Sequence, residues 1–252
     1  MDYKLEYMER LFAKISKKKT ESYVISRIWH QLNDDRVKFV VQQYIRRTHD
    51  KYALADLYLP QLNILIEINE PFHKNNNQVD KIRNEEIINT THAQLLVVDC
   101  DNDIQEIHRQ ISIIVWAIKL TIQQLGEKFQ AWDDVSTLSV EYHRNKGYLK
   151  VEDNECLRTT EDVAAIFGTV AKHRGFLRAS GAAIPNKKNE IAWWPNTEHH
   201  LWHNELSEDG MFIYEYPKVN EKREAHLNQW LSAPEETRIT FLRYKDDLGF
   251  CF

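Results

Sequence analysis

The sequence predicts an α/β protein, with a mixed sheet flanked by helices in its first half and a β-rich module in its second. Apolar residues recur at helical spacing in residues 20–32 and 102–125, and β-branched and aromatic runs lie between them. Beyond Gly126 the strands shorten, and turns containing Gly, Pro and Asn recur. With 252 residues, of which 42% are hydrophobic, the chain can bury one large core or two modest ones.

The first half is predicted to follow the order α-β-β-β-α-β-α. Thr20 can cap an amphipathic helix, and Gly126 is suited to end a long helix whose isoleucines recur on one side. Near-alternation of β-branched and aromatic residues indicates the strands. The expected segments are a helix at 20–32, strands at about 37–46, 52–59 and 63–69, a helix at 79–92, a strand at 93–100 and a helix at 102–125.

A domain boundary is expected between residues 126 and 136, which gives domains at 1–128 and 129–252. The second domain is predicted to hold helices at about 159–173 and 221–232 among short strands. It ends on "RITFLRYKDDLGFCF", a strand, a turn and the start of another strand. We therefore expect either that the sheet closes there or that this domain is truncated at its C-terminus.

Composition limits the classes of function. A formal charge of -5 and a pI near 6.1 argue against a surface coated with basic residues, so any DNA contact must come from local clusters at 17–19, 46–47 or 174–188. Each cluster is equally an ordinary solvated face. Three distant cysteines argue against a disulfide framework and a zinc ribbon. No apolar run approaches the roughly 18 residues of a membrane span, so we expect a soluble cytoplasmic protein with no membrane partner.

Acidic residues interrupt two of the predicted strands. Side chains two residues apart share a face, so Glu67 and Asn69 stand side by side, and Asp56 lies in the preceding strand. A hairpin through "PQLN" would bring Asp56 and Glu67 close enough to share a divalent cation, as in phosphodiesterases that bind Mg²⁺. Alternatively, Asp56 is a turn residue, and Glu67 forms a structural salt bridge with Arg46 or Arg83.

A family resemblance extends this pattern. Residues 15–125 contain D-x10-E-x-N-E-x-x-H followed by D-x-x-R, which resembles the Vsr-like branch of the PD-(D/E)xK nucleases. The residues of the pattern are Asp56, Glu67, Asn69, Glu70, His73, Asp80 and Arg83. Asn69 and Glu70 stand where that branch commonly has Asp-Gly, so either of them could complete the site. Asp80 and Arg83 are alternatively only a helix-stabilising pair.

The resemblance implies a catalytic role for further residues. Asp56 and Glu67 would be the metal ligands, with Mg²⁺ as the cofactor. His73 would transfer a proton or contact the phosphate, and Glu21 would be the acid contributed by the first predicted helix.

The stretch "WWPNTEHHLWHNELSEDGMFIYEYPK" concentrates tryptophans, histidines and acids in the second domain. Trp193 and Trp194 are expected in an aromatic core beneath the sheet. A pocket for a flipped base needs an aromatic face and an amide or acid for the Watson–Crick edge, which Trp202, Asn204 and Glu215 can supply. W-x-N followed eleven positions later by E resembles the SRA-like domain of the AbaSI-like type IV restriction endonucleases, which cut DNA carrying 5-hydroxymethylcytosine or its glucosylated form.

In that family a Vsr-like nuclease precedes an SRA-like reader, so the resemblance spans nearly the whole chain. It implies that Trp202, Asn204 and Glu215 contact the modified base, and that two copies cooperate as a homodimer to cut both strands of double-stranded DNA at a distance from it. The implied function is a Mg²⁺-dependent endonuclease of bacterial phage defence. Two alternatives stay open, a Vsr-like nuclease with another DNA target and a catalytically inactive protein that binds modified DNA. The long helix at 102–125 is expected to cover the sheet rather than meet a partner.

Overall fold

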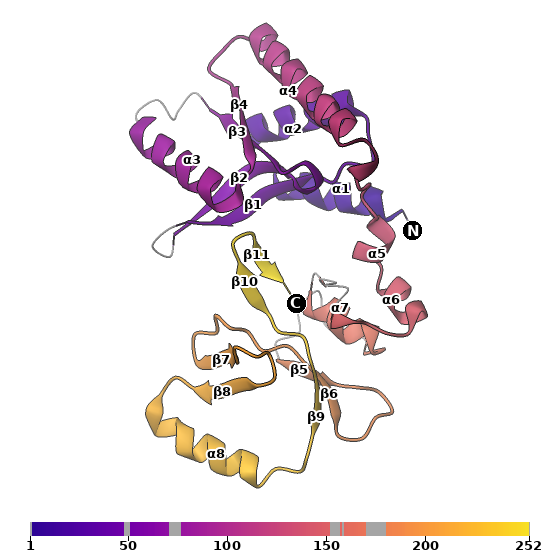
Figure 1. Ribbon diagram of the computed structural model, residues 1–252, viewed down its shortest axis with the longest axis vertical. Helices are drawn as coiled ribbons and strands as arrows, with labels where there is room; N and C mark the ends of the chain where they lie inside the picture. Colours follow the sequence, from indigo (N-terminus) through magenta and orange to yellow (C-terminus); the bar gives the residue numbers. More distant parts are fainter. Residues whose placement is uncertain are drawn as a thin grey trace. The chain divides into compact units, whose positions relative to one another are not determined.

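The computed structural model describes residues 2–47, 51–70, 77–151, 157, 159–169 and 180–251. The chain divides into two compact units. The first comprises Met1–Asp134 with Asp247–Gly249, and the second comprises Val135–Asp246 with Phe250–Phe252. The first unit holds a four-stranded sheet, and the second holds smaller sheets and hairpins (Figure 1).

A mixed sheet forms the centre of the first unit. Its strands, in spatial order, are β1 (Val40–Arg46), β2 (Tyr52–Leu59), β3 (Ile64–Asn69) and β4 (Gln94–Asp99). The pairs β1–β2 and β2–β3 are antiparallel, and β3–β4 is parallel. The short 3-10 helix η1 (Pro60–Leu62) joins β2 to β3, so the hairpin expected through "PQLN" is confirmed.

Helices cover both faces of this sheet (Figure 1). They are α1 (Tyr3–Lys14), α2 (Lys19–Leu32), α3 (Asn77–Thr91) and α4 (Ile104–Leu125). Buried residues of α1, α2 and α4 share one cluster with Ile64, Ile66 and Ile68, while Leu65 packs with Ile87 of α3 in another. The alternation expected along β3 is therefore confirmed, and both of its faces are apolar because helices lie on both sides.

Three features of this unit differ from the sequence-based expectation. Thr20 does not cap α2, because the helix already begins at Lys19 and its N-cap residue is Lys18. Helix α1 was not expected, although Asp2 caps it and Met8 and Leu11 bury one side of it. Strand β1 begins at Val40 rather than at 37, because the Lys38 N–H donates to the Gln61 side chain at 2.7 Å instead of to a neighbouring strand. The apolar stripe of α4 packs into the core, so this helix covers the sheet as predicted.

The second unit is rich in short strands. Strands β5 (Gly181–Ala183), β6 (Glu190–Trp193) and β9 (Thr237–Thr240) form one sheet, while two hairpins pair β7 (Trp202–Leu206) with β8 (Ile213–Pro217) and β10 (Tyr244–Asp246) with β11 (Gly249–Cys251). Its helices are α5 (Asp134–Leu138), α6 (Val140–Lys146), α7 (Thr160–Ile166) and α8 (Arg223–Leu231).

The core of the second unit contains the predicted aromatic residues. Trp193 and Trp194 are buried, and Trp194 packs with Val163 and Ala192. The helix expected at 159–173 ends at Ile166, because Gly168 adopts a left-handed φ of 82° two residues later. Residues 170–173 of that prediction, and residues 174–179 of the basic cluster at 174–188, lie outside the described residues.

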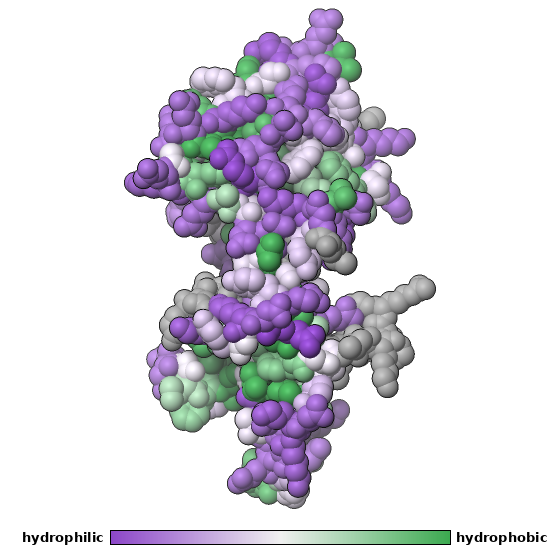
Figure 2. All heavy atoms as spheres, turned by 90° about the vertical axis from the view of Figure 1, so that its right-hand side faces the viewer, coloured by the Kyte–Doolittle hydropathy of each residue, from purple (hydrophilic) through white to green (hydrophobic). Residues whose placement is uncertain are grey.

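The surface of the protein is mostly hydrophilic on the face drawn in Figure 2, and apolar side chains gather there in patches. Within the described part of the chain, no helix combines the length and the apolar character needed to cross a membrane.

Candidate functional site

Three buried carboxylates come together in the first unit. Glu21 on α2 is 8% exposed, Asp56 on β2 is 9% exposed and Glu67 on β3 is 5% exposed. The β2–β3 register ends at the pair of Leu57 with Ile66, and Asp56 and Glu67 are the next residues beyond this pair. Burying carboxylates is unfavourable unless each has partners, so the contacts of these side chains are informative.

Hydrogen bonds hold Asp56 and Glu21 firmly. Asp56 accepts from the Ile68 N–H at 2.8 Å through Oδ2 and from the Gln42 amide at 3.1 Å through Oδ1. The same Gln42 nitrogen donates to Glu21 Oε2 at 2.8 Å, and Lys18 Nζ donates to Glu21 Oε1 at 2.7 Å. Gln42 therefore links the two acids directly, a role that the sequence analysis did not identify.

Glu67 has a different partner. Arg83 of α3 lies 3.2 Å from Glu67 Oε2 and 3.4 Å from Oε1, so one of the two salt bridges foreseen for a structural glutamate is present. Asp56, by contrast, lies within β2 rather than at a turn. The ion pair and a catalytic role for Glu67 are compatible, because Arg83 leaves the carboxylate next to two other acids.

Burial raises the pKa of all three acids, and repulsion from neighbouring carboxylates adds to the rise at Glu67 and Glu21. At Glu67, burial together with the charges of Asp56 and Glu21 raises the pKa to about 7 against the opposing effect of Arg83. Burial likewise raises the pKa of Asp56 and of Glu21, and the Asp56 charge adds to the shift at Glu21. A divalent cation would relieve this repulsion.

The carboxylate oxygens are the hard ligands that Mg²⁺ prefers, so the chemistry of the cluster fits this ion. In the arrangement described, the nitrogens of Lys18, Gln42 and Arg83 hold the carboxylates. No group of three His, Cys, Asp or Glu side chains among the described residues has the spacing of a formed metal site. Binding of a metal would thus require these side chains to rearrange.

The remaining predicted catalytic residues, Asn69, Glu70 and His73, differ in how they relate to the carboxylate cluster. Asn69 ends β3 with an exposed side chain, and its carbonyl accepts from the Cys100 N–H at 2.9 Å. Glu70 follows it, and the Glu70 charge contributes to the raised pKa of Glu21, so Glu70 acts electrostatically on the cluster. His73 lies outside the described residues. Of the two candidates for completing the site, Glu70 has the closer connection to it.

The second unit brings the predicted base-binding residues onto one face of the β7–β8 hairpin. The antiparallel register pairs Asn204 with Glu215 and Trp202 with Pro217. Residues paired across strands, and residues two apart along a strand, point to the same side. Trp202, Asn204 and Glu215 therefore share a face. Their spacing along β7 groups Trp202 with Asn204, and the strand pairing adds Glu215.

Asn204 carries an unused acceptor. Its side chain is 7% exposed, and Nδ2 donates to the Asn196 carbonyl at 2.9 Å. Oδ1 has no hydrogen-bond partner among the described residues. A buried oxygen without a partner is unfavourable, so a hydrogen bond from a bound donor would be favourable at this position.

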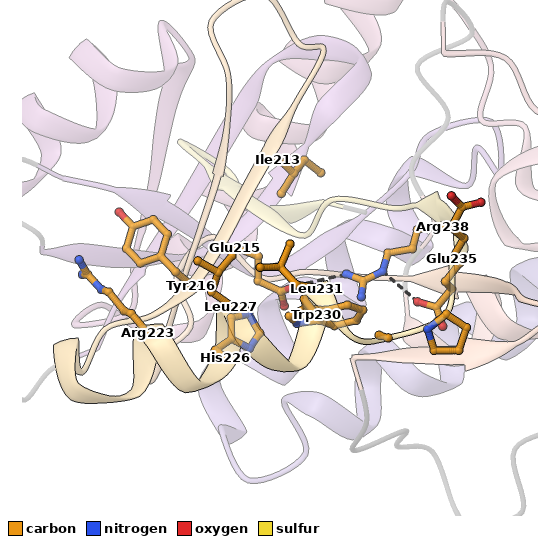
Figure 3. A pocket seen from close by; sticks show the side chains of 13 residues that line it. Ile213, Glu215, Tyr216, Arg223, His226, Leu227, Trp230, Leu231, Glu235 and Arg238 are labelled. Atoms are coloured by element: carbon orange, nitrogen blue, oxygen red, sulfur yellow. Dashed lines mark hydrogen bonds and ion pairs between the residues drawn. The ribbon is translucent and has the colours of Figure 1, made fainter.

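Glu215 opens onto a pocket of about 860 Å³ between β8, β9 and α8 (Figure 3). Arg238 reaches across it to Glu215 at 3.2 Å, and its guanidinium stacks 4.6 Å from the Trp193 ring and 4.2 Å from the Trp230 ring. The Trp202 ring meets His226 of α8 edge-on at 4.8 Å. Sequence analysis did not identify Arg238, because Trp193 is distant in the chain and Trp230 lies on a different element, α8.

Comparisons with known proteins bear on both units. The family model for the N-terminal part of PvuRts1 I-like restriction endonucleases matches residues 5–152, and the model for the SET and RING associated (SRA) domain matches residues 142–252. Among solved structures, the 5-hydroxymethylcytosine-specific restriction enzyme AbaSI is 31% identical with a TM-score of 0.55, over 98% of this chain and 89% of that one. Curated proteins give no match. The chain belongs to the PvuRts1 I-like restriction endonucleases and carries an SRA domain in its C-terminal part.

Proposed function

We propose that the protein is a Mg²⁺-dependent endonuclease that cleaves double-stranded DNA at a distance from 5-hydroxymethylcytosine or its glucosylated form. Membership of a restriction endonuclease family supports the hydrolysis of DNA. The specificity of AbaSI, whose similarity covers almost the entire chain, supports the modified base as the recognised feature. Such an enzyme would act in the bacterial cytoplasm against phage DNA.

The carboxylate cluster is the proposed catalytic site, as in the Vsr-like PD-(D/E)xK nucleases. Asp56 and Glu67 would hold the ion, with Glu21 and Glu70 adding negative charge beside it. Bound Mg²⁺ supplies a Lewis acid for the phosphate and lowers the pKa of a water molecule. The chain itself contributes a buried set of acids, and backbone and amide donors hold Asp56 and Glu21 in the metal-free arrangement.

The unused Asn204 oxygen is the observation that best supports base recognition in the second unit. A cytosine flipped out of the duplex presents an N4 amino donor, and Asn204 Oδ1 and Glu215 are acceptors on one face of the hairpin. Trp202 on the same face offers an aromatic surface. The pocket next to Glu215 leaves room for a substituent on C5, including a hexose.

A single catalytic site cuts one strand of a duplex at a time. The described part of the first unit contains a single cluster of buried carboxylates. We therefore propose that two copies act together, each cutting one strand.

A cleavage assay on three matched duplexes tests the proposal. The duplexes contain cytosine, 5-hydroxymethylcytosine or glucosylated 5-hydroxymethylcytosine and are incubated with Mg²⁺ or with EDTA. We expect cleavage confined to the two modified duplexes and abolished by EDTA. Equal cleavage of all three would refute the assignment of Trp202, Asn204 and Glu215, whereas binding of the modified duplexes without cleavage would refute the catalytic assignment.

A further inference from the structure

We propose that Gln42 is the positioning residue of the carboxylate cluster, and that strand β1 retains a strained backbone in order to place its amide between Glu21 and Asp56. This inference rests on the proposed catalytic site. It concerns a residue that neither the sequence motif nor the family comparison singles out.

The backbone at Gln42 is exceptional for a strand. Its φ is 52°, in the left-handed region that residues with a Cβ atom adopt at a cost. The described chain has five other non-glycine residues with positive φ, four asparagines and one histidine. These residues lie at helix ends or in turns, where short polar side chains tolerate this conformation, whereas Gln42 lies inside β1.

The distortion coincides with the candidate site. The β1–β2 ladder pairs Val41 with Leu57 and Gln43 with Ala55, but it omits the pair between them, Gln42 and Asp56. The strands also change faces at this step. Val41 and Leu57 pack in the cluster beneath α2 and α4, whereas Ala55 packs in the cluster beneath α3, although residues two apart should share a face.

The side-chain amide of Gln42 forms hydrogen bonds with two of the buried acids. Gln42 Nε2 donates to Glu21 Oε2 at 2.8 Å and to Asp56 Oδ1 at 3.1 Å, so one nitrogen fixes the separation of two acids from different elements. An amide has two N–H donors and no charge. It can therefore hold two buried carboxylates together without a permanent positive charge that would compete with a cation.

Strain that persists in a folded protein is concentrated where it serves function. In the case of Gln42, the strained residue is also the one whose side chain bridges the acids. If the conformation served only folding, glycine would serve better, because glycine adopts positive φ without a Cβ penalty. We infer that the side chain, and not the backbone conformation alone, is what the site requires.

Gln42→Gly and Gln42→Ala separate backbone strain from the function of the amide. Both substitutions remove the amide, but only glycine accepts φ 52° freely, so the glycine variant should have a Tm about 2 to 4 °C above that of the alanine variant. Both should lose at least about 10-fold in affinity for Ca²⁺, measured by calorimetry as a non-cleaving substitute for Mg²⁺, because the two acids are no longer held together. Cleavage of modified DNA should fall about 100-fold or more in both.

Gln42→Asn and Asn33→Gly complete the set. Asparagine tolerates positive φ but is one methylene too short to bridge both acids, so its Ca²⁺ affinity should fall as well. Asn33, at the C-terminal end of α2, has a φ of 48°, so Asn33→Gly changes a comparable backbone position away from the acids and should leave Ca²⁺ binding and cleavage unchanged.

Wild-type Ca²⁺ affinity in Gln42→Gly would overturn the inference, even if Asp56→Asn abolished binding and so upheld the site. An equal Tm for the glycine and alanine variants would also overturn it, because strain at residue 42 would then be absent. If the wild type bound Ca²⁺ but cut no DNA, the proposed function would fail while calorimetry on the variants still decided the role of Gln42.

Discussion

Replacing Glu67 by glutamine should stabilise the metal-free protein at alkaline pH while abolishing cleavage. Burial raises the pKa of this carboxyl from an ordinary 4.5 to about 7. A tenfold change in an acid dissociation constant corresponds to about 1.4 kcal/mol, so above pH 7 the ionised side chain costs the folded state about 3 kcal/mol. Between pH 4.5 and 7 the folded protein keeps a proton that the unfolded chain has released, so stability is lost as the pH rises through this window.

Glutamine cannot ionise, so the variant avoids this cost while keeping an acceptor for Arg83. Thermal unfolding in EDTA at pH 5 and pH 8 measures the effect. The Tm of Glu67→Gln relative to wild type should rise by about 5 to 10 °C between these pH values, since most of the roughly 3 kcal/mol develops across that interval.

A control without this pH dependence is available on α4. The Arg109 side chain lowers the pKa of Glu106, so this carboxylate is largely ionised in both the folded and the unfolded chain above pH 5. The Tm of Glu106→Gln relative to wild type should therefore stay nearly constant between pH 5 and pH 8. A constant Tm difference for Glu67→Gln across this range would refute the argument that Glu67 is a buried acid held at a cost.

Three further predictions test the remaining parts of the structure. Asp56→Asn keeps an acceptor for the Ile68 N–H but removes a ligand charge, so cleavage should fall about 1000-fold or more while the gel-shift affinity for modified DNA stays unchanged. Asn204→Leu removes the unused acceptor and should lower cleavage of 5-hydroxymethylcytosine DNA, relative to cytosine DNA, by about 10-fold or more. Gly181→Ala would place a Cβ atom 2.9 Å from the Ala192 carbonyl oxygen and should destabilise the second unit by roughly 1 to 3 kcal/mol in urea unfolding, without changing Ca²⁺ binding.

Local sequence patterns predicted most of the first unit. The segments from α2 to α4 appear in the expected order, because apolar periodicity is a property of neighbouring residues. The proximity of Asp56 and Glu67 was also predictable, since a short turn joins their strands. Helix α1 was missed because its charged residues obscure a narrow apolar side.

The sequence by itself determined which acids and which base-binding residues are candidates, because motif spacing and apolar alternation are local properties of the chain. Only the tertiary structure decided what surrounds them. Glu21 reaches Asp56 through the packing of α2 on the sheet, and Gln42 joins them through a backbone conformation that no side-chain pattern specifies. Arg238 of β9 likewise contacts Trp193 of β6 and Trp230 of α8 because these elements lie close together in the folded unit. Such contacts depend on which surfaces pack together, which periodicity along the chain does not encode.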